Sequence, residues 1–165
     1  MIFLTVGTQF PFDRLVKAVD KAMERSGCAV EVFAQIADSS YRPRCFDAVS
    51  YLQKDEFDKN MREASSIISH AGMGTITAAL ENRKPILVMP RLRKYSEVVN
   101  DHQVAIAKKF EQLGHLVVAY SEQDVPEKIK ALEQFVPTER KKSVDAVTQR
   151  ISSFIQQVMQ MGEFA

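Results

Sequence analysis

The sequence predicts an α/β fold: a single Rossmann-like, doubly wound parallel sheet with helices on both faces. Three observations lead to this prediction. Short apolar runs alternate with segments of helical periodicity, the apolar runs lack the alternation of water-facing strands, and their spacing fits right-handed crossovers between parallel strands. With 165 residues, 45% of them hydrophobic and 26% charged, the chain has the size and composition of one globular domain.

The elements are expected in a regular order. A buried strand at 2–6 precedes an amphipathic helix at 12–25, whose apolar residues recur every three or four positions while Asp13 and Asp20 face water. Gly27 closes this helix. The same patterns predict strands at 29–36 and 46–52, a helix ending at 64, a strand at 65–69, a helix at 75–82, a strand at 86–89, a helix from 100 to 113, a strand at 116–120, and a helix at 122–135.

A last helix is expected at 139–161, after the α/β pattern is complete. It carries a long apolar stripe: Val144, Val147, Ile151, Phe154, Ile155, Val158 and Met159. We expect residues 1–165 to form one domain whose terminal helix either packs back on its own sheet or meets a partner chain. Without that partner, self-association into a homo-oligomer through the stripe is the expected outcome.

Charge and cysteine content narrow the functional classes. Lys and Arg total 22 against 21 Asp and Glu, a net charge of +1, so no basic field favours a nucleic-acid partner. Cys28 and Cys45 lack the count and spacing of a disulfide framework or a zinc site, and are interpreted as two buried reduced thiols in a reducing cytoplasm. The apolar run 1–7 is too short for a signal peptide, and no window is long enough to span a membrane.

The segment His70-Ala71-Gly72-Met73-Gly74-Thr75 is the clearest candidate site. Glycines between a buried strand and a helix let the backbone approach a ligand, and the first helical amides then face an anion such as phosphate, with the Thr75 hydroxyl as a further donor. The alternative is a tight turn that only allows the helix to pack on the sheet. The segment lacks the third glycine of a dinucleotide fingerprint and the Lys of a P-loop.

Other polar residues are candidates beside this loop. Gly7 and Thr8 follow the first strand at the same carboxyl edge of the sheet, where open α/β folds bind ligands. No third ligand accompanies His70 and His102, so no metal site is expected. The run 91–94 is interpreted as a solvated loop, with a phosphate clamp as the alternative. Polar side chains gather where the next helix begins, which fits recognition of a hydroxyl-rich ligand: Asn100, Asp101, His102 and Gln103.

Four segments, in this order and spacing, resemble glycosyltransferase family 28: Phe3-Leu4-Thr5-Val6-Gly7-Thr8, His70-Ala71-Gly72-Met73-Gly74-Thr75, Lys84-Pro85-Ile86-Leu87-Val88-Met89-Pro90 and Asn100-Asp101-His102-Gln103. More closely, they are similar to the short bacterial exopolysaccharide glycosyltransferases, which are related to the catalytic subunit of the eukaryotic dolichol-linked N-acetylglucosaminyltransferase. The resemblance covers about residues 1 to 116 and implies the donor-binding, C-terminal half of a GT-B fold.

The resemblance also implies roles for single residues. The glycine loop and Thr75 would contact the diphosphate of a UDP-sugar, and His102 and Gln103 would reach the sugar. Where many relatives carry a glutamate that holds the ribose, this chain has Ala78, so that contact is either lost or passed to Glu81. No cofactor besides the UDP-sugar substrate is implied.

These observations predict the catalytic, UDP-sugar-binding subunit of a two-component inverting hexosyltransferase in exopolysaccharide or capsule synthesis. A membrane-associated subunit would bind the lipid-linked saccharide acceptor and recruit the cytoplasmic chain to the inner face of the membrane. The catalytic base is left open between Asp13 and a residue of the partner. The alternatives are a non-catalytic nucleotide-sugar-binding or regulatory subunit, which the missing glutamate at Ala78 favours, and a nucleotide-sugar epimerase.

Overall fold

A computed structural model describes residues 1–138. Six parallel strands form one sheet in the order β3-β2-β1-β4-β5-β6. The elements along the chain are β1 (Ile2–Thr5), α1 (Asp13–Arg25), β2 (Val32–Gln35), β3 (Asp47–Val49), α2 (Lys54–Glu63), β4 (Ser66–His70), α3 (Met73–Glu81), β5 (Ile86–Met89), the 3-10 helix η1 (Arg93–Tyr95), α4 (His102–Gln112), β6 (Val117–Val118) and α5 (Val125–Leu132). The predicted Rossmann-like α/β fold is confirmed.

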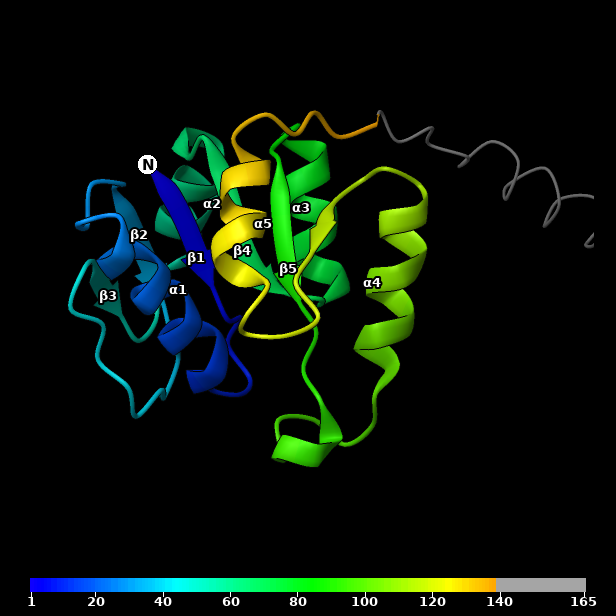
Figure 1. The fold of residues 1–165 in the computed structure, drawn as a ribbon, viewed down its shortest axis with the longest axis horizontal. Helices are drawn as coiled ribbons and strands as arrows, with labels where there is room; N and C mark the ends of the chain where they lie inside the picture. Colours follow the sequence, from blue (N-terminus) through cyan, green and yellow to red (C-terminus); the bar gives the residue numbers. More distant parts are fainter. Residues whose placement is uncertain (139–165) are drawn as a thin grey trace, which may run out of the picture.

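Helices cover both faces of the sheet, as Figure 1 shows for α1 and α5 in front and α2 and α3 behind. Successive residues of β1 point to opposite faces: Leu4 packs in the core under α1 and α5, whereas Phe3 packs in the core under α2, α3 and α4. Both side chains are fully buried. Burial on both faces explains why β1 reads as an uninterrupted apolar run.

The chain changes direction across the sheet between β1 and β4. These strands are neighbours, with Ile2 opposite Ser66 and Thr5 opposite Ser69. From β1 the chain continues outward to β2 and β3, and from β4 it continues outward to β5 and β6. The loops that leave β1 and β4 therefore diverge at the carboxyl edge and leave a crevice between them, where such folds bind ligands. The two predicted glycine loops lie at this point.

Several boundaries differ slightly from the prediction. Gly72 is the N-cap of α3, so the helix begins at Met73 and includes Gly74. Asp101 is the N-cap of α4, and Gly114 follows that helix with φ +68°. The 3-10 helix η1 was not predicted, because a single turn inside a polar loop produces no apolar periodicity. It projects with the β5–α4 loop from the carboxyl edge, at the bottom of Figure 1.

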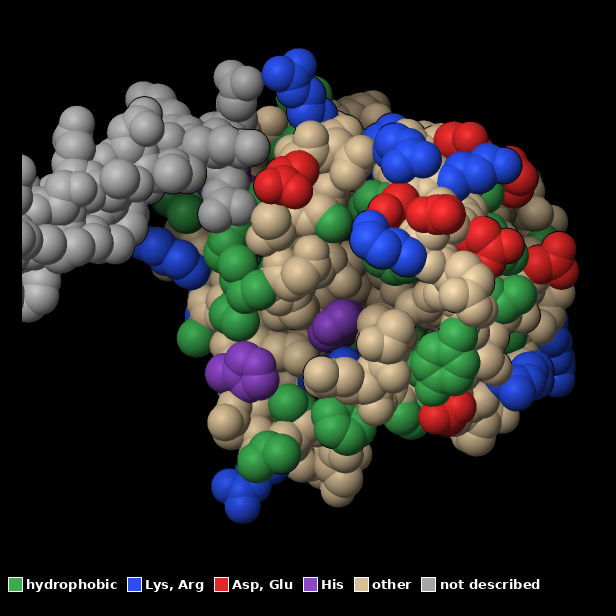
Figure 2. Space-filling model, turned by 180° about the vertical axis from the view of Figure 1, so that it is seen from behind, with side chains coloured by type: hydrophobic (Ala, Val, Ile, Leu, Met, Phe, Trp, Pro, Cys, Tyr) green, Lys and Arg blue, Asp and Glu red, His purple; other side chains and the backbone are tan. Residues whose placement is uncertain are grey.

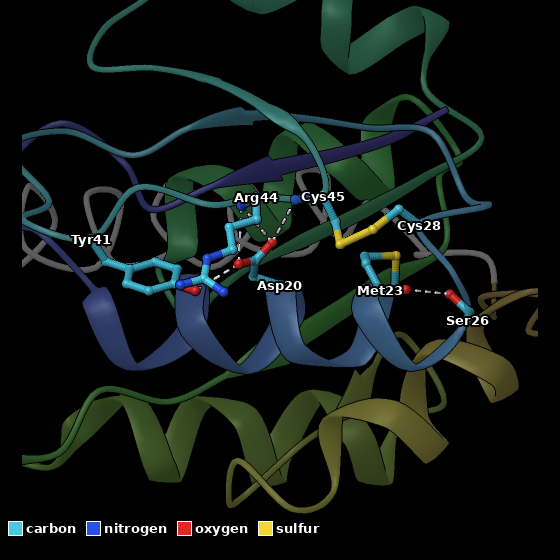
Figure 3. Close-up of a disulfide and its surroundings, with 7 residues drawn as sticks. All are labelled: Asp20, Met23, Ser26, Cys28, Tyr41, Arg44 and Cys45. Atoms are coloured by element: carbon cyan, nitrogen blue, oxygen red, sulfur yellow. Dashed lines mark hydrogen bonds between the residues drawn. A yellow bond between two sulfur atoms is a disulfide. The ribbon is translucent and has the colours of Figure 1, made fainter.

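The prediction of two buried reduced thiols is wrong. Cys28 and Cys45 form a disulfide between the end of α1 and the β2–β3 loop, with 5.1 Å between their Cα atoms (Figure 3). Gly27, with φ +67°, turns the chain after α1 and leaves Cys28 exposed. Neither the number nor the spacing of the cysteines indicates this pairing, because the β2–β3 loop reaches α1 only in the folded chain.

Asp20, expected in water, lies under this loop and is only 4% exposed. Its carboxylate accepts hydrogen bonds from the Arg44 amide (3.0 and 3.1 Å), the Cys45 amide (2.9 Å) and the Tyr41 hydroxyl (2.6 Å) (Figure 3). A buried carboxylate needs such donors to replace its water. Asp20 therefore draws residues 41–45 onto α1 and brings Cys45 beside Cys28.

The predicted helix at 139–161 lies outside the described residues. Within residues 1–138, no helix has both the length and the apolar character to cross a bilayer.

Candidate functional site

The two glycine loops share one pocket at the carboxyl edge of the sheet. This pocket of about 390 Å³ is lined by Gly7, Thr8, Gln35, Leu52, Lys54, Phe57, Gly74 and Thr75. Figure 2 views the face covered by α2, α3 and α4, and shows histidine side chains (purple) beside a hollow towards that edge. Four of the predicted site residues therefore surround one cavity: Gly7, Thr8, Gly74 and Thr75.

A buried polar network fixes the loops around this pocket. The Gln35 amide nitrogen donates to Thr5 Oγ1 (3.3 Å) and to the Gly7 carbonyl (3.2 Å), and its oxygen accepts from the Leu52 amide (3.1 Å). Thr5 Oγ1 also accepts from the Gly7 amide (3.2 Å). Because Thr5 and Gln35 are fully buried, these bonds satisfy groups that water does not reach. The ends of β1 and β2 and the start of α2 are thus held together.

His70 sits between the two glycine loops. A Cβ added to Gly7 would lie 3.0 Å from His70 Cε1, and one added to Gly72 would lie 2.2 Å from His70 Nε2. Gly7 also has φ +78°, a conformation that side chains other than glycine rarely adopt. Gly7 is therefore favoured by its turn as well as by the imidazole ring, and Gly72 by the imidazole ring alone.

The imidazole of His70 is neutral. Burial, and to a lesser extent the nearby charge of Arg91, lower its pKa from 6.5 to about 4, although a hydrogen bond with the Thr5 backbone acts in the opposite direction. Ser69 Oγ donates to the Thr5 carbonyl (2.6 Å) and is 3.1 Å from His70 Nδ1. Since the serine proton is already used, its oxygen accepts from Nδ1, which places the imidazole proton there and leaves Nε2 as an acceptor.

The first turn of α3 faces open space. A Cβ added to Gly74 would meet nothing within 4 Å, and Thr75 lines the pocket. The first amides of a helix have no partners within the helix, and together with its dipole they attract an anion. A side chain at position 74 would leave the protein core untouched and would extend into the space in front of these amides.

One member of the polar cluster at the start of α4 is buried and holds the β5–α4 loop. Gln103 is 5% exposed, and its Oε1 accepts from the Arg91 amide (3.1 Å). Asp101 and His102 are exposed, with Asp101 accepting from the Arg93 amide (2.7 Å) and the His102 amide donating to Asn100 (3.2 Å). None of these side chains lines the pocket between the glycine loops.

Glu81 is not brought to the pocket. It is the last residue of α3, whereas Gly74 and Thr75 lie in the first turn. Glu81 lies six positions after Thr75 in the helix, roughly 9 Å along the axis. Glu81 is exposed at the far end of the helix, and Ala78 lies midway, partly buried.

The interpretation of 91–94 as a solvated loop is wrong for its first residue. Arg93 and Lys94 are exposed, but Arg91 is only 4% exposed. Its guanidinium donates to the carbonyls of Val6 (2.9 Å) and Phe10 (2.6 Å). Arg91 lies two residues after the end of β5 and binds the β1–α1 loop, but the sequence alone does not distinguish it from the solvated cations that follow.

A second arginine, Arg14, links α1 to the β5–α4 loop at the same edge of the sheet. Arg14 binds Glu97 through two hydrogen bonds of 2.8 Å and donates to the Pro90 carbonyl (3.0 Å). Glu97 also accepts from the Leu92 amide (2.9 Å). This bidentate ion pair joins α1 to the β5–α4 loop. Both of its side chains are about 10% exposed, so water screens the attraction only weakly.

Asp13 is poorly suited to act as a base. Its carboxylate accepts hydrogen bonds from the Ser39 and Ser40 hydroxyls and from the Ser40 amide. Burial alone would raise the pKa of Asp13, but these hydrogen bonds lower it below its ordinary value. The carboxylate is thus engaged in holding residues 39 and 40 to α1, and its affinity for a proton is reduced.

Sequence reasoning missed four residues that line the pocket: Gln35, Leu52, Lys54 and Phe57. Gln35 has a visible signal, because it is the polar residue at the end of the apolar strand β2. Lys54 is the first residue of α2, whereas the apolar periodicity that predicts this helix begins only at Phe57. The Lys54 ammonium forms an ion pair with Asp58 at 2.6 Å. The pocket brings these segments together only through the fold.

Comparison with known proteins finds relatives that share one name. UDP-N-acetylglucosamine transferase subunit ALG13 of Homo sapiens is 31% identical over 125 residues, which are 70% of this chain and 10% of the human protein. The subunit of the same name from Eremothecium gossypii is 42% identical over 53 residues, 32% of this chain and 24% of that protein. The chain therefore corresponds to about a tenth of the human protein's length.

Solved structures share the fold. The NMR solution structure of ALG13 has a TM-score of 0.59 at 19% identity, covering 88% of this chain and 93% of that one. The crystal structure of Acinetobacter baumannii MurG has a TM-score of 0.60 at 18% identity, covering 81% of this chain and 42% of that one. At these identities the likeness supports the Rossmann-like fold alone.

The family follows from a match over nearly the whole chain. Residues 1–158 match the glycosyltransferase family 28 C-terminal domain. Both glycine loops and the polar start of α4 fall within the matched range. The chain belongs to glycosyltransferase family 28, as a form of that family's C-terminal domain.

Proposed function

We propose that the chain is the catalytic, UDP-sugar-binding subunit of a two-component inverting hexosyltransferase. The observation that carries this proposal is the pocket between the two glycine loops, with the first turn of α3 open beside it. Backbone amides and the Thr75 hydroxyl would bind the diphosphate there. Gln35 and Thr5 hold the Gly7 loop on the other side of the pocket, so its shape is set before the ligand arrives.

The reaction would be a direct displacement at the anomeric carbon. An acceptor hydroxyl loses its proton to a base and attacks that carbon while UDP leaves with the electrons of the broken bond. The main contribution of this chain is electrostatic, because the α3 amides stabilise the charge that develops on the leaving diphosphate. Asp13 is occupied by Ser39 and Ser40, which supports a base supplied by the partner subunit.

The relatives suggest the donor. They are UDP-N-acetylglucosamine transferase subunits, which supports UDP-N-acetylglucosamine as the first donor to test, beside other UDP-hexoses. His102 and Gln103 would contact the sugar, with Gln103 held by Arg91 through its oxygen and its amide nitrogen left to donate. The acceptor would be a lipid-linked saccharide in exopolysaccharide or capsule synthesis, presented to this cytoplasmic chain by a membrane-associated subunit.

Calorimetric titration with UDP and a panel of UDP-sugars tests the proposal. We expect UDP to bind the wild-type chain, and Gly74→Val to abolish binding while the circular dichroism spectrum and melting temperature stay close to wild type. We expect Gln103→Ala to weaken UDP-sugar binding by about 1–3 kcal/mol, with a smaller effect on UDP. A folded Gly74→Val protein that binds UDP with unchanged affinity would refute the site.

A non-catalytic nucleotide-sugar-binding subunit is the second candidate. Ala78 favours it, because the position of the glutamate carried by many relatives has no side chain to hold the ribose, and Glu81 lies at the far end of α3. Measuring UDP release with and without the co-expressed partner separates the two: a binding subunit would add nothing to the partner's own rate.

A further inference from the structure

Arg91 carries a buried charge that the contacts of the protein only partly satisfy. One of its terminal nitrogens donates to both the Val6 and the Phe10 carbonyls, while its Nε, also buried, has no hydrogen-bond partner. Among residues 1–138, it is the one buried side-chain nitrogen or oxygen in this condition. An unsatisfied buried group of this kind costs stability.

No carboxylate binds Arg91 directly in the described contacts. Glu97 is the acid that acts on it electrostatically, but both Glu97 oxygens accept hydrogen bonds from Arg14. The Arg91 guanidinium lies over the Phe12 ring, 5.0 Å from its centroid, and burial lowers the pKa of Arg91 to about 10, a change that Glu97 opposes. The group remains a cation at neutral pH in a site that removes most of its water.

The contacts of Arg91 connect three segments of the carboxyl edge. Its side chain holds the β1–α1 loop at Val6 and Phe10, on either side of Gly7 and Thr8. Its backbone amide holds Gln103 at the start of α4. Thr5 Oγ1 and Gln35 hold the same loop at Gly7 itself, so Arg91 adds the contacts on either side of it.

We infer that Arg91 is a positioning residue of the proposed nucleotide-sugar site, whose buried guanidinium holds the Val6–Phe10 loop in the shape that places Gly7 and Thr8 for the diphosphate. The inference rests on the proposed function for the identity of the ligand. Its effect on the loop is independent of that ligand. A nucleoside diphosphate bound at this edge would also bring negative charge toward this buried cation.

The experiment compares three variants with the wild type. Arg91→Met removes the charge and both carbonyl contacts. Arg91→Lys keeps the charge but replaces the planar fork by a single ammonium on a more flexible stem. Arg93→Met is the matched control, because it removes the same charge from an exposed position two residues along the same loop. Melting temperatures are recorded for all four proteins, and Arg91→Lys takes the place of Arg91→Met if the latter does not fold.

Two measurements follow. Amide NMR spectra without ligand report the Gly7 and Thr8 loop, and calorimetry with UDP reports binding. We expect both Arg91 variants to shift or broaden the Gly7 and Thr8 signals, Arg91→Met to weaken UDP binding by about tenfold or more, and Arg93→Met to change it by less than about threefold. The UDP affinity of Arg91→Lys should fall between those of the wild type and Arg91→Met, because lysine keeps the positive charge but lacks the planar guanidinium that binds both carbonyls.

Other results overturn the inference. Unchanged Gly7 and Thr8 signals in folded Arg91 variants would show that the loop holds its shape without Arg91. An equal loss of UDP affinity in Arg93→Met would assign the effect to the general charge of the loop. If the wild-type chain itself fails to bind UDP, the proposed function fails, while the ligand-free NMR comparison still decides whether Arg91 positions the loop.

Discussion

At His70, burial and the Arg91 charge hold the imidazole neutral at physiological pH, with a pKa of about 4. Because an unfolded histidine titrates near 6.5, the unfolded chain binds more protons than the folded chain between about pH 4 and 6.5. The free energy of unfolding therefore falls as the pH drops through this range and levels off below it. The contribution is on the order of 3 kcal/mol.

Two measurements check this prediction. In NMR titrations the Cε1 proton of His70 should show a midpoint near pH 4, and a midpoint near 6.5 would contradict the structure. Denaturant unfolding at pH 7 and pH 4.5 should show a pH-dependent loss that is reduced in His70→Gln. His102→Gln is the matched control, since the His102 side chain is exposed, and its pH dependence should follow the wild type.

Gly72 and Gly74 lie two residues apart and should respond differently to one methyl group. In Gly72→Ala the new Cβ would lie 2.2 Å from His70 Nε2, so the buried ring must move, and we expect a loss of about 1–3 kcal/mol in the free energy of unfolding. In Gly74→Ala the Cβ meets open space, and stability should be unchanged or slightly higher. Urea unfolding of both variants measures the contrast, and equal effects would argue against the described packing of His70.

At the scale of elements, two kinds of contact hold the β2–β3 loop to α1: the hydrogen bonds of Asp20 and the disulfide. Asp20→Asn keeps the size of the side chain but turns an amide group toward backbone donors, so we expect a loss of about 2–3 kcal/mol. Tyr41→Phe removes a single hydrogen bond to Asp20 and should lose about half as much. Denaturant unfolding measures both, and an Asp20→Asn protein as stable as wild type would remove the carboxylate from this role.

The disulfide gives a separate prediction. It closes a loop across a sequence separation of 17 residues, for which the entropy of the unfolded chain predicts roughly 3 kcal/mol of stabilisation. Unfolding with and without reductant should differ by about this amount. The double variant Cys28→Ser, Cys45→Ser is the control and should be insensitive to reductant. Two free thiols in the untreated protein, counted by mass spectrometry after alkylation, would show that the pair does not form.

The accuracy of the sequence-based boundaries also differs between elements. The central strands β1, β4 and β5 were predicted to within a residue, because burial on both faces produces an apolar run with sharp ends. Three other strands were predicted too long: 29–36 became Val32–Gln35, and, at the two edges, 46–52 became Asp47–Val49 and 116–120 became Val117–Val118. An edge strand pairs on one side only, so its ladder ends where its single neighbour ends, which the local sequence does not encode.

In the candidate site, features that depend on local sequence were predictable and features that depend on distant segments were not. Gly7, Thr8, Gly74 and Thr75 were found from strand–glycine–helix patterns, which depend on neighbouring residues alone. Gln35 and Arg91 were missed as supports, because their value depends on carbonyls and amides of distant segments. Cys28 and Cys45 were misinterpreted for the same reason.

At the scale of the whole molecule, the two-component proposal predicts that the isolated chain is inactive in sugar transfer. We expect the purified chain to bind UDP but to transfer no sugar to a lipid-linked acceptor until the partner subunit is added. Activity of the complex should fall in Phe154→Asp, a change in the terminal apolar stripe predicted from the sequence. Radiolabelled transfer assays measure this, and full turnover by the isolated chain would overturn the two-component proposal.

Both edges of the sheet are built from its shortest strands, three residues in β3 and two in β6. The unpaired amides and carbonyls on an edge are the groups by which another polypeptide extends a sheet, in recognition as well as in aggregation. Strands this short present few of them, so neither edge is a template for strand addition. We therefore expect a partner of residues 1–138 to bind through loops and helix faces, so a search for its contacts starts at the carboxyl-edge loops and on the helices.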